Sequence, residues 1–157
     1  MAKARLASLL LLITAACAMT PERLPELDRR FYYNLPNPDS QEEFLDVPAS
    51  ERQAYLESKG LWQQWVNLPE KEREAAASGD VQTGFHEFGL FMAWGPPADT
   101  QKRDVNERPI TQHTYIRCTS GPKAGRYVRN NLDCDGTSTE TKVSISNGIV
   151  SEIEYVK

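Results

Sequence analysis

The sequence has 157 residues, of which 39% are hydrophobic and 25% are charged, with 10 prolines and 9 glycines. This composition is typical of one globular domain with some linker, and it excludes a collagen, a disordered acidic tail and a multi-domain enzyme. The net charge of −4 argues against a general nucleic-acid binder, because neutralising phosphates requires a surplus of lysine and arginine.

The first residues have the pattern of a bacterial export signal. Lys3 and Arg5 precede an apolar run over residues 6–13, and small residues then lead to Cys17. This order predicts a signal peptide over residues 1–16. The apolar run is too short to span the ~30 Å hydrocarbon core of a bilayer, and no later stretch has the ~20 apolar residues that a span requires. We therefore expect no transmembrane helix in the mature chain.

The small residues before Cys17 resemble the lipobox of bacterial lipoproteins, in which the cysteine is acylated and begins the mature chain. The resemblance implies lipidation of Cys17, and several acyl chains would make membrane anchoring stable. The non-acidic Ala18 implies the outer membrane, with the domain facing the periplasm. The alternative is an ordinary signal peptide, whose cleavage releases a soluble periplasmic or secreted protein. Loss of residues 1–16 removes Lys3 and Arg5, so the net charge falls from −4 to −6.

Cys118 and Cys134 remain as an even pair in an oxidising periplasm, which favours a disulfide between them. It would close a loop of roughly 15 residues and stabilise the fold by about 3 kcal/mol in the chain-entropy model. Free thiols are the alternative. Zinc binding is disfavoured because neither a C-x-x-C pair nor an H-x-x-x-H pair accompanies these cysteines.

The rest of the chain divides into a tether and one domain. Residues 17–38 contain four prolines among charged residues, which predicts the lipidated cysteine and a tether. Residues 39–157 are expected to form a single α+β domain. Helical spacing dominates residues 40–95 and strand-like alternation dominates residues 110–157, so N-terminal helices would pack on a three- to four-stranded antiparallel sheet.

Two helices that start at prolines are expected early in the domain. One covers residues 48–59 and the other residues 69–78, and each precedes a glycine, which is common after a helix end. Their surroundings repeat, because the Phe-Leu-Asp-Val-Pro-x-x-Glu-Arg-x-Ala segment from Phe44 recurs in related form 21 residues later, from Trp65. Two copies are too few for a solenoid, so a helical hairpin is expected.

Two further helical signals flank this repeat. Ser40 and Glu43 predict a capping box at an earlier helical turn. Residues 85–94 predict a helix that ends at Gly95, and apolar residues cover more than one of its faces. This helix is therefore expected to be buried.

Alternating residues predict the strands, which are expected at residues 112–118, 126–132, 141–146 and 149–156. The last two strands flank an Asn-Gly pair. A two-residue loop would pair Ile145 with Val150, whereas a three-residue loop over residues 146–148 would pair Ile145 with Ile149. We predict the second register, because it gathers the β-branched residues of both strands on one buried face. That face would contain Val143, Ile145, Ile149 and Ile153.

Residues 84–157 resemble the small lipoprotein domain of the BamE/SmpA (OmlA) type. The resemblance consists of Gly84 opening a short apolar helix, its Trp94-Gly95-Pro96-Pro97 end, a strand with Tyr115, and the final hairpin over residues 143–153. It implies an α+β lipoprotein domain that takes part in the assembly or maintenance of the outer membrane.

The motifs of known catalytic sites are missing. His86 and Glu87 begin an H-E-x-x-H motif, but Leu90 occupies the place of the second zinc ligand. His113 lies on a predicted strand, where a surface or edge role is expected. No nucleophile elbow, P-loop or dinucleotide fingerprint occurs. We therefore expect that the chain is not an enzyme and that it binds no cofactor or metal.

One segment partly matches a calcium-binding loop. Asn131, Asp133 and Asp135 precede Gly136 with EF-hand spacing, but Lys142 replaces the bidentate glutamate that such a loop needs. A polar turn beside the cysteine is therefore expected, with a weak cation site as the alternative.

Charge is distributed unevenly along the chain. Residues 21–80 hold 13 acidic and 7 basic residues, whereas residues 101–130 hold 2 acidic and 7 basic residues. If the basic side chains share one face, they suit an anionic partner such as an acidic protein, lipid head groups or a wall polymer. Neutralisation by the acidic helices is the alternative. The candidate partner-binding residues are Lys102, Arg103, Arg108, Arg117, Lys123, Arg126 and Arg129.

These patterns together predict a lipid-anchored envelope protein with a non-catalytic, macromolecule-binding periplasmic domain. Its expected partners are the membrane, through the lipid anchor, and an envelope protein or anionic polymer, but not a nucleic acid. Trp62 and Trp65 are further candidate contacts, with packing in the core as their alternative. A secreted periplasmic inhibitor or ligand-binding module is the alternative function.

Overall fold

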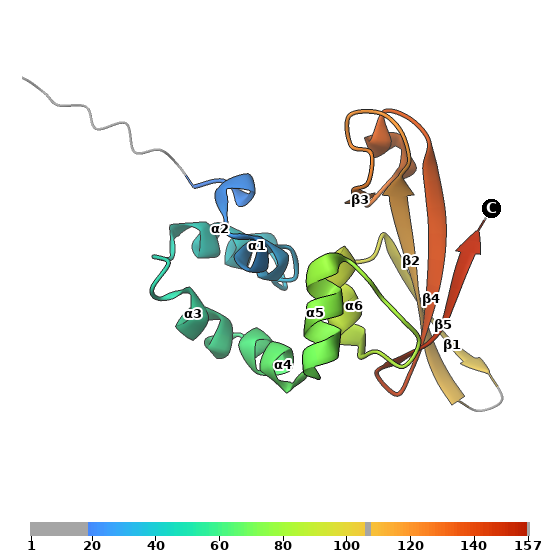
Figure 1. The fold of residues 1–157 in the computed structure, drawn as a ribbon, viewed down its shortest axis with the longest axis horizontal. Helices are drawn as coiled ribbons and strands as arrows, with labels where there is room; N and C mark the ends of the chain where they lie inside the picture. The colour runs from blue at the N-terminus through green and yellow to red at the C-terminus, as the bar shows by residue number, and fades with distance from the viewer. Residues whose placement is uncertain (1–18, 106–107, 157) are drawn as a thin grey trace, which may run out of the picture.

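The computed structural model describes residues 19–105 and 108–156. Figure 1 shows a helical region on one side, a twisted sheet on the other and the helix α6 between them. The predicted signal peptide over residues 1–16 and the predicted lipidation of Cys17 lie outside the described residues. The predicted fold class is confirmed, because N-terminal helices precede and cover an antiparallel sheet. In the described residues this sheet has five strands, not the three to four expected.

The helical region contains a series of short helices. In chain order they are the 3-10 turn η1 (Pro21–Arg23), α1 (Glu26–Tyr33), α2 (Pro38–Asp46), α3 (Arg52–Ser58), α4 (Leu61–Asn67), α5 (Glu70–Ser78) and α6 (Glu87–Trp94). In the part of the chain that the structure describes, no helix is both long and apolar enough to cross a bilayer.

The segment predicted as a tether is part of the folded domain from η1 onward. Phe31 on α1 is 0% exposed, and its ring lies 5.8 Å from that of Trp62 and 6.2 Å from that of Trp65. Leu24 and Leu35, on either side of α1, are also buried. The tether prediction is therefore wrong here, because these apolar side chains fill the core of the helical region.

The helix starts differ from the predictions at two places. The Asn37 side chain, and not Ser40, caps α2 by accepting a hydrogen bond from the Ser40 amide at 2.8 Å. The helix expected from Pro48 begins at Arg52, after one turn.

The sequence repeat corresponds to a repeated local structure. Val47 and Leu68 are extended, and their amides bond to the carbonyls of Phe44 and Trp65 at the preceding helix ends. A proline then follows, and another helix begins after it. The repeat is thus a helix–proline–helix junction, and α4, which lies between α3 and α5 and begins the second copy, replaces the simple hairpin that was expected.

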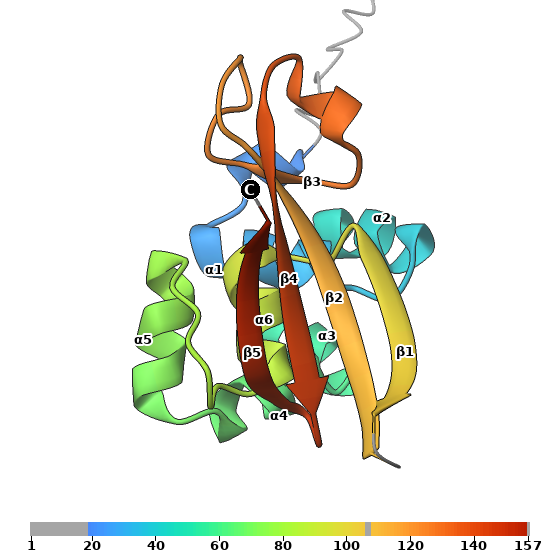
Figure 2. The same cartoon turned by 90° about the vertical axis from the view of Figure 1, so that its right-hand side faces the viewer.

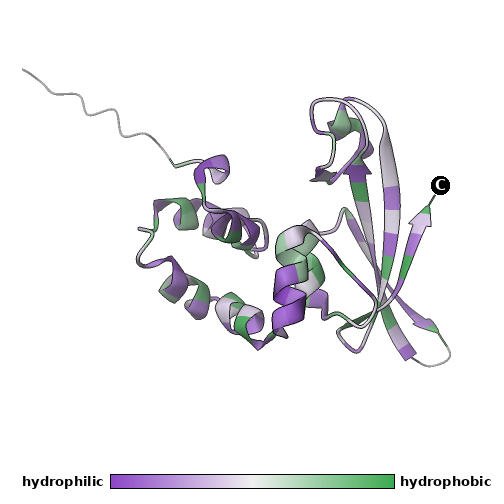
Figure 3. Cartoon of the chain, viewed as in Figure 1, coloured by the Kyte–Doolittle hydropathy of each residue, from purple (hydrophilic) through white to green (hydrophobic). Residues whose placement is uncertain are grey.

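Helix α6 is buried, as predicted, and it contributes to two separate cores. Met92 packs in the helical core with Phe31, Phe44 and Leu56, whereas other α6 side chains pack in the core beneath the sheet. That second core contains Phe85, Leu90, Trp94, Tyr115, Val143, Ile145 and Val150. Figure 3 shows hydrophobic residues on α6 and hydrophilic ones on the first turns of α5.

The sheet is antiparallel throughout its described residues. Its strands are β1 (Asp99–Val105), β2 (Arg108–Cys118), β3 (Tyr127–Val128), β4 (Ser138–Ser146) and β5 (Ile149–Val156). The order is β1-β2-β4-β5, and β3 pairs with β2 beyond the end of β1 (Figure 2).

The strands differ from the predictions at two places. Strand β1 was not predicted, because all seven of its residues are exposed and it shows no inside–outside alternation. The strand expected over residues 126–132 is only Tyr127–Val128, because the 3-10 turn η2 (Asn131–Cys134) follows it. This turn is the polar turn expected at the partial calcium motif.

The predicted register of the last hairpin is wrong at its turn. Positive φ angles of 51° at Asn147 and 75° at Gly148 make a two-residue loop, which pairs Ile145 with Val150. A β-bulge next to this pair shifts the register, so that Val143 lies opposite Ile153. Val150 therefore takes the buried place expected for Ile149, while Ile153 keeps its predicted side.

Candidate functional site

Side chains of α1 and of the residue after it donate hydrogen bonds to the C-terminal ends of two other helices. The Arg30 guanidinium donates hydrogen bonds to the carbonyls of Met92 at 2.7 Å and Ala93 at 3.1 Å on α6, and to that of Ala77 at 2.8 Å on α5. The Asn34 side-chain amide donates to the Phe91 carbonyl at 2.9 Å. Carbonyls at a helix C-terminus lack helical hydrogen-bond donors and carry partial negative charge. Arg30 supplies both the donors and a compensating positive charge.

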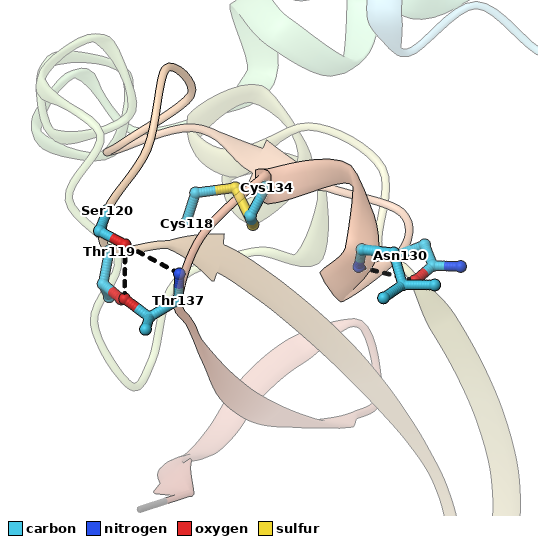
Figure 4. Close-up of a disulfide and its surroundings, with 7 residues drawn as sticks. Cys118, Thr119, Ser120, Asn130, Cys134 and Thr137 are labelled. Carbon is cyan, nitrogen blue, oxygen red and sulfur yellow. Dashed lines mark hydrogen bonds between the residues drawn. A yellow bond between two sulfur atoms is a disulfide. The ribbon is translucent and has the colours of Figure 1, made fainter.

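A disulfide joins Cys118 at the end of β2 to Cys134 in η2, as predicted, with the Cα atoms 5.3 Å apart (Figure 4). Both cysteines are buried. We call residues 118–137 the disulfide loop. Its two ends are tied together, because the Ser120 hydroxyl accepts from the Thr137 amide at 2.8 Å. The loop is thereby held against the end of the sheet.

A groove of about 1070 Å³ lies between α1, the ends of α5 and α6, and the disulfide loop. Four cations on its wall come from distant parts of the chain, and we call this surface the basic groove. They are Arg29, Arg117, Lys123 and Arg126. Arg30 and Arg129 also line it, as do the acidic residues Glu22, Asp80 and Asp133.

Among the described residues, the four cations of the basic groove have no acidic partner. No carboxylate in residues 19–105 and 108–156 lies within 4.0 Å of their charged nitrogens. Arg30 and Arg129 differ. Arg30 forms an ion pair with Glu26 at 2.7 Å in addition to its bonds to carbonyls, and Arg129 donates to the Pro97 carbonyl at 3.0 Å. The groove therefore keeps an excess of positive charge.

The carboxylate of Glu22 is influenced by this positive charge, although it forms no ion pair with a described residue. The pKa of Glu22 is lowered, first by a hydrogen bond from its own backbone and then by the Thr20 hydroxyl, with smaller contributions from the charges of Arg126 and Arg29. Glu22 is exposed to solvent, so it offsets the positive charge of the groove only in part.

A cluster of packed aromatic rings, the aromatic floor, adjoins the basic groove through Trp94 and Tyr127. Trp94 stacks on Tyr127 with the ring centres 5.2 Å apart, and Tyr115 packs edge-on against both. Burial raises the pKa of Tyr127 to about 12 and also raises that of Tyr115. Two further rings, those of Tyr33 and Tyr155, are 43% and 70% exposed and lie on the rim. The groove thus offers both cations and accessible aromatic surface.

The structure divides the predicted basic residues into two groups. Arg117, Lys123, Arg126 and Arg129 line the basic groove. Lys102, Arg103 and Arg108 lie near the turn of the β1–β2 hairpin, at the other end of the sheet, where Arg108 is about 30 Å from Arg117 along the nine residues of β2 that separate them. Sequence reasoning missed Arg29 and Arg30, which had been placed in the tether.

The two tryptophans proposed as contacts are parts of the helical core. Trp65 is only 8% exposed, and Trp62 packs against the same cluster. Their alternative assignment, to the core, is therefore correct.

The expectation that His113 is a surface or edge residue is wrong. Its ring is 4% exposed, because β2 is a central strand whose inner face meets α6. Its Nε2 atom lies 2.6 Å from the Glu87 carboxylate and its Nδ1 atom 2.8 Å from the Thr100 hydroxyl. A second cavity of about 460 Å³ lies beside His113, Thr100 and residues 33–38.

His86 pairs with a different carboxylate. Its Nδ1 atom lies 3.0 Å from the carboxylate of Glu72, which also accepts the His86 amide at 2.9 Å. The two histidine–carboxylate pairs link the start of α6 to α5 and to the sheet, which is a structural role.

Comparisons with known proteins return no similarity: no family model, no curated protein and no solved structure matches this chain. The resemblance of residues 84–157 to the BamE/SmpA type therefore stays a prediction.

Proposed function

We propose that the chain is a lipid-anchored protein of the outer membrane whose periplasmic α+β domain binds a macromolecular partner and catalyses no reaction. Its role would be in outer-membrane assembly or maintenance. The observation that supports this proposal is the basic groove, where four cations lie together without an acidic partner in the part of the chain that the structure describes.

Unpaired cations concentrated in a groove attract anionic groups and speed association with them. The remaining charges of the domain are mostly acidic, so the groove contrasts with the rest of the surface. Arginine and tyrosine are also enriched among the residues that contribute most to protein interfaces. Arg117, Arg126 and Tyr155 offer these side chains on one wall and rim.

The anchor is tested by the intact mass of the protein extracted from cell envelopes with detergent. A chain that begins at Cys17 and carries acyl mass is expected. An unacylated chain in the soluble periplasm would overturn the anchor and favour a secreted inhibitor or ligand-binding module.

The groove is tested by two triple variants that change the net charge equally. One carries Arg117→Glu, Lys123→Glu and Arg126→Glu, and its control carries Lys102→Glu, Arg103→Glu and Arg108→Glu at the other end of the sheet. After chemical cross-linking in cells, the groove variant is expected to lose the partner that the wild type and the control retain. Equal recovery with both variants would overturn the assignment of the groove.

A further inference from the structure

Strand β5 is an edge strand that is covered over only part of its length. Near its start, the Gly84 amide bonds to the Val150 carbonyl and the Val150 amide to the Phe85 carbonyl, each at 2.8 Å. From Ser151 to Val156, its backbone pairs with β4 alone among the described residues. Figure 2 shows β5 at the margin of the sheet. The outer edge of this stretch therefore offers unpaired amides and carbonyls.

This open edge leads into the basic groove. Tyr155 lines the groove together with Thr141, its partner on β4, and Ser78–Val81 lies on the α5 side. Arg117 and Arg126 line the same groove from the end of the sheet and the disulfide loop. Unpaired backbone and unpaired cations thus belong to one continuous surface.

The two faces of β5 differ in charge, because only the outer face carries charged residues. Ile153 and Tyr155 share the inner face with Val143 and Thr141, whereas Glu152 and Glu154 point to the outer face, opposite Ser144 and Lys142. A chain lying beside β5 would therefore have one side toward the basic groove, whose cations lie farther across the sheet on β2, the disulfide loop and α1, and its other side toward the carboxylates of Glu152 and Glu154.

We propose that the basic groove binds an extended acidic segment of a partner protein, which adds to the sheet as a strand alongside β5. Acidic side chains occupy its groove side, and neutral or basic side chains occupy its outer side. This inference rests on the proposed binding function and specifies its ligand. Only a peptide supplies the alternating amides and carbonyls that the edge of β5 can pair with, so a lipid head group or a glycan would use the cations alone.

The test is binding of fluorescein-labelled ten-residue peptides to the detergent-solubilised full mature chain, measured by fluorescence polarisation. The parent peptide alternates Glu with Thr, and a second peptide alternates Lys with Thr. Two derivatives of the parent carry N-methyl groups on every Glu or on every Thr. In a strand, amides of alternate residues point to opposite edges, so one derivative blocks pairing with β5 and the other does not.

The parent peptide is expected to bind more tightly than the Lys–Thr peptide. One N-methylated derivative is expected to bind about tenfold more weakly than the other, which corresponds to the loss of one or two hydrogen bonds. Equal binding of the two derivatives would overturn strand addition. Equal or tighter binding of the Lys–Thr peptide would overturn the acidic ligand. Neither result touches the proposed binding function, which the cellular cross-linking of the two triple variants decides separately.

Discussion

The helical region and the disulfide end of the sheet use their charged residues in opposite ways. In the helical region, Arg52 is buried and bonds to Asp28 at 2.9 Å, and Arg30 bonds to the carbonyls of two helix ends. At the disulfide end, Arg117 and Arg126 have no carboxylate within 4.0 Å in the described part of the chain. Charge holds the first region together, and charge at the second remains available to a partner.

The strongest way to break this comparison is to remove the anchor of the helical core. Phe31→Ala is expected to lower the free energy of unfolding by about 4 kcal/mol, because a fully buried ring leaves a cavity. Tyr33→Ala, at an exposed ring two residues later, is the control and is expected to change stability by less than about 0.5 kcal/mol. Equal stability of the two variants in urea unfolding would mean that this segment is a tether and not part of the folded core.

Removing the disulfide tests how much it stabilises the end of the sheet that carries the basic groove. Replacing Cys118 and Cys134 together by alanine is expected to lower the free energy of unfolding by about 3 kcal/mol, because the unfolded chain has more conformational freedom without the disulfide. Urea unfolding of the oxidised wild type and the double variant measures the difference. A loss below about 1 kcal/mol would mean that the remaining loop contacts suffice without the disulfide.

The contrast between structural and free arginines can be tested on two neighbours. Arg30→Met is expected to lower the free energy of unfolding by about 2 kcal/mol, because it leaves carbonyls on α5 and α6 without their donor. Arg29→Met removes a groove cation and is expected to leave stability within about 0.5 kcal/mol of the wild type. Thermal unfolding compares the two, and the reverse order would contradict the division of roles.

The smallest expected effect concerns the aromatic floor at high pH. The pKa of Tyr127 is about 12 in the folded protein and near its ordinary value of 10 when unfolded. Between these values the unfolded chain loses a proton that the folded chain retains, so stability falls as pH rises from 10 to 12. Tyr127→Phe should weaken this fall, and urea unfolding across that range measures it. An unchanged pH dependence in the variant would contradict burial as the cause.

Local patterns were enough to predict much of the fold. The order of helices and sheet, the burial of α6 and the cysteine pair all follow from short-range periodicity or from the expected compartment. The disulfide could be predicted because only two cysteines remain after Cys17.

Some errors are local, such as the loop of the last hairpin and the cap of α2, but the largest ones involve partners far apart in the sequence. Phe31 is buried by Trp62 and Trp65, about thirty residues later, so the tether assignment failed. Strand β1 is held by its pairing with β2 and has no buried face to show an alternating pattern. The basic groove joins α1 to the disulfide loop, which no local pattern of charge reveals.

The central claim is that the partner binds at the disulfide end of the sheet. The most direct measurement places a photoreactive phenylalanine analogue at Tyr155, on the groove rim, or at Val105, an exposed residue at the turn end of the β1–β2 hairpin. After illumination of living cells, a cross-linked partner is expected from position 155 and not from position 105. An adduct from position 105 alone, or equal adducts from both, would contradict the account.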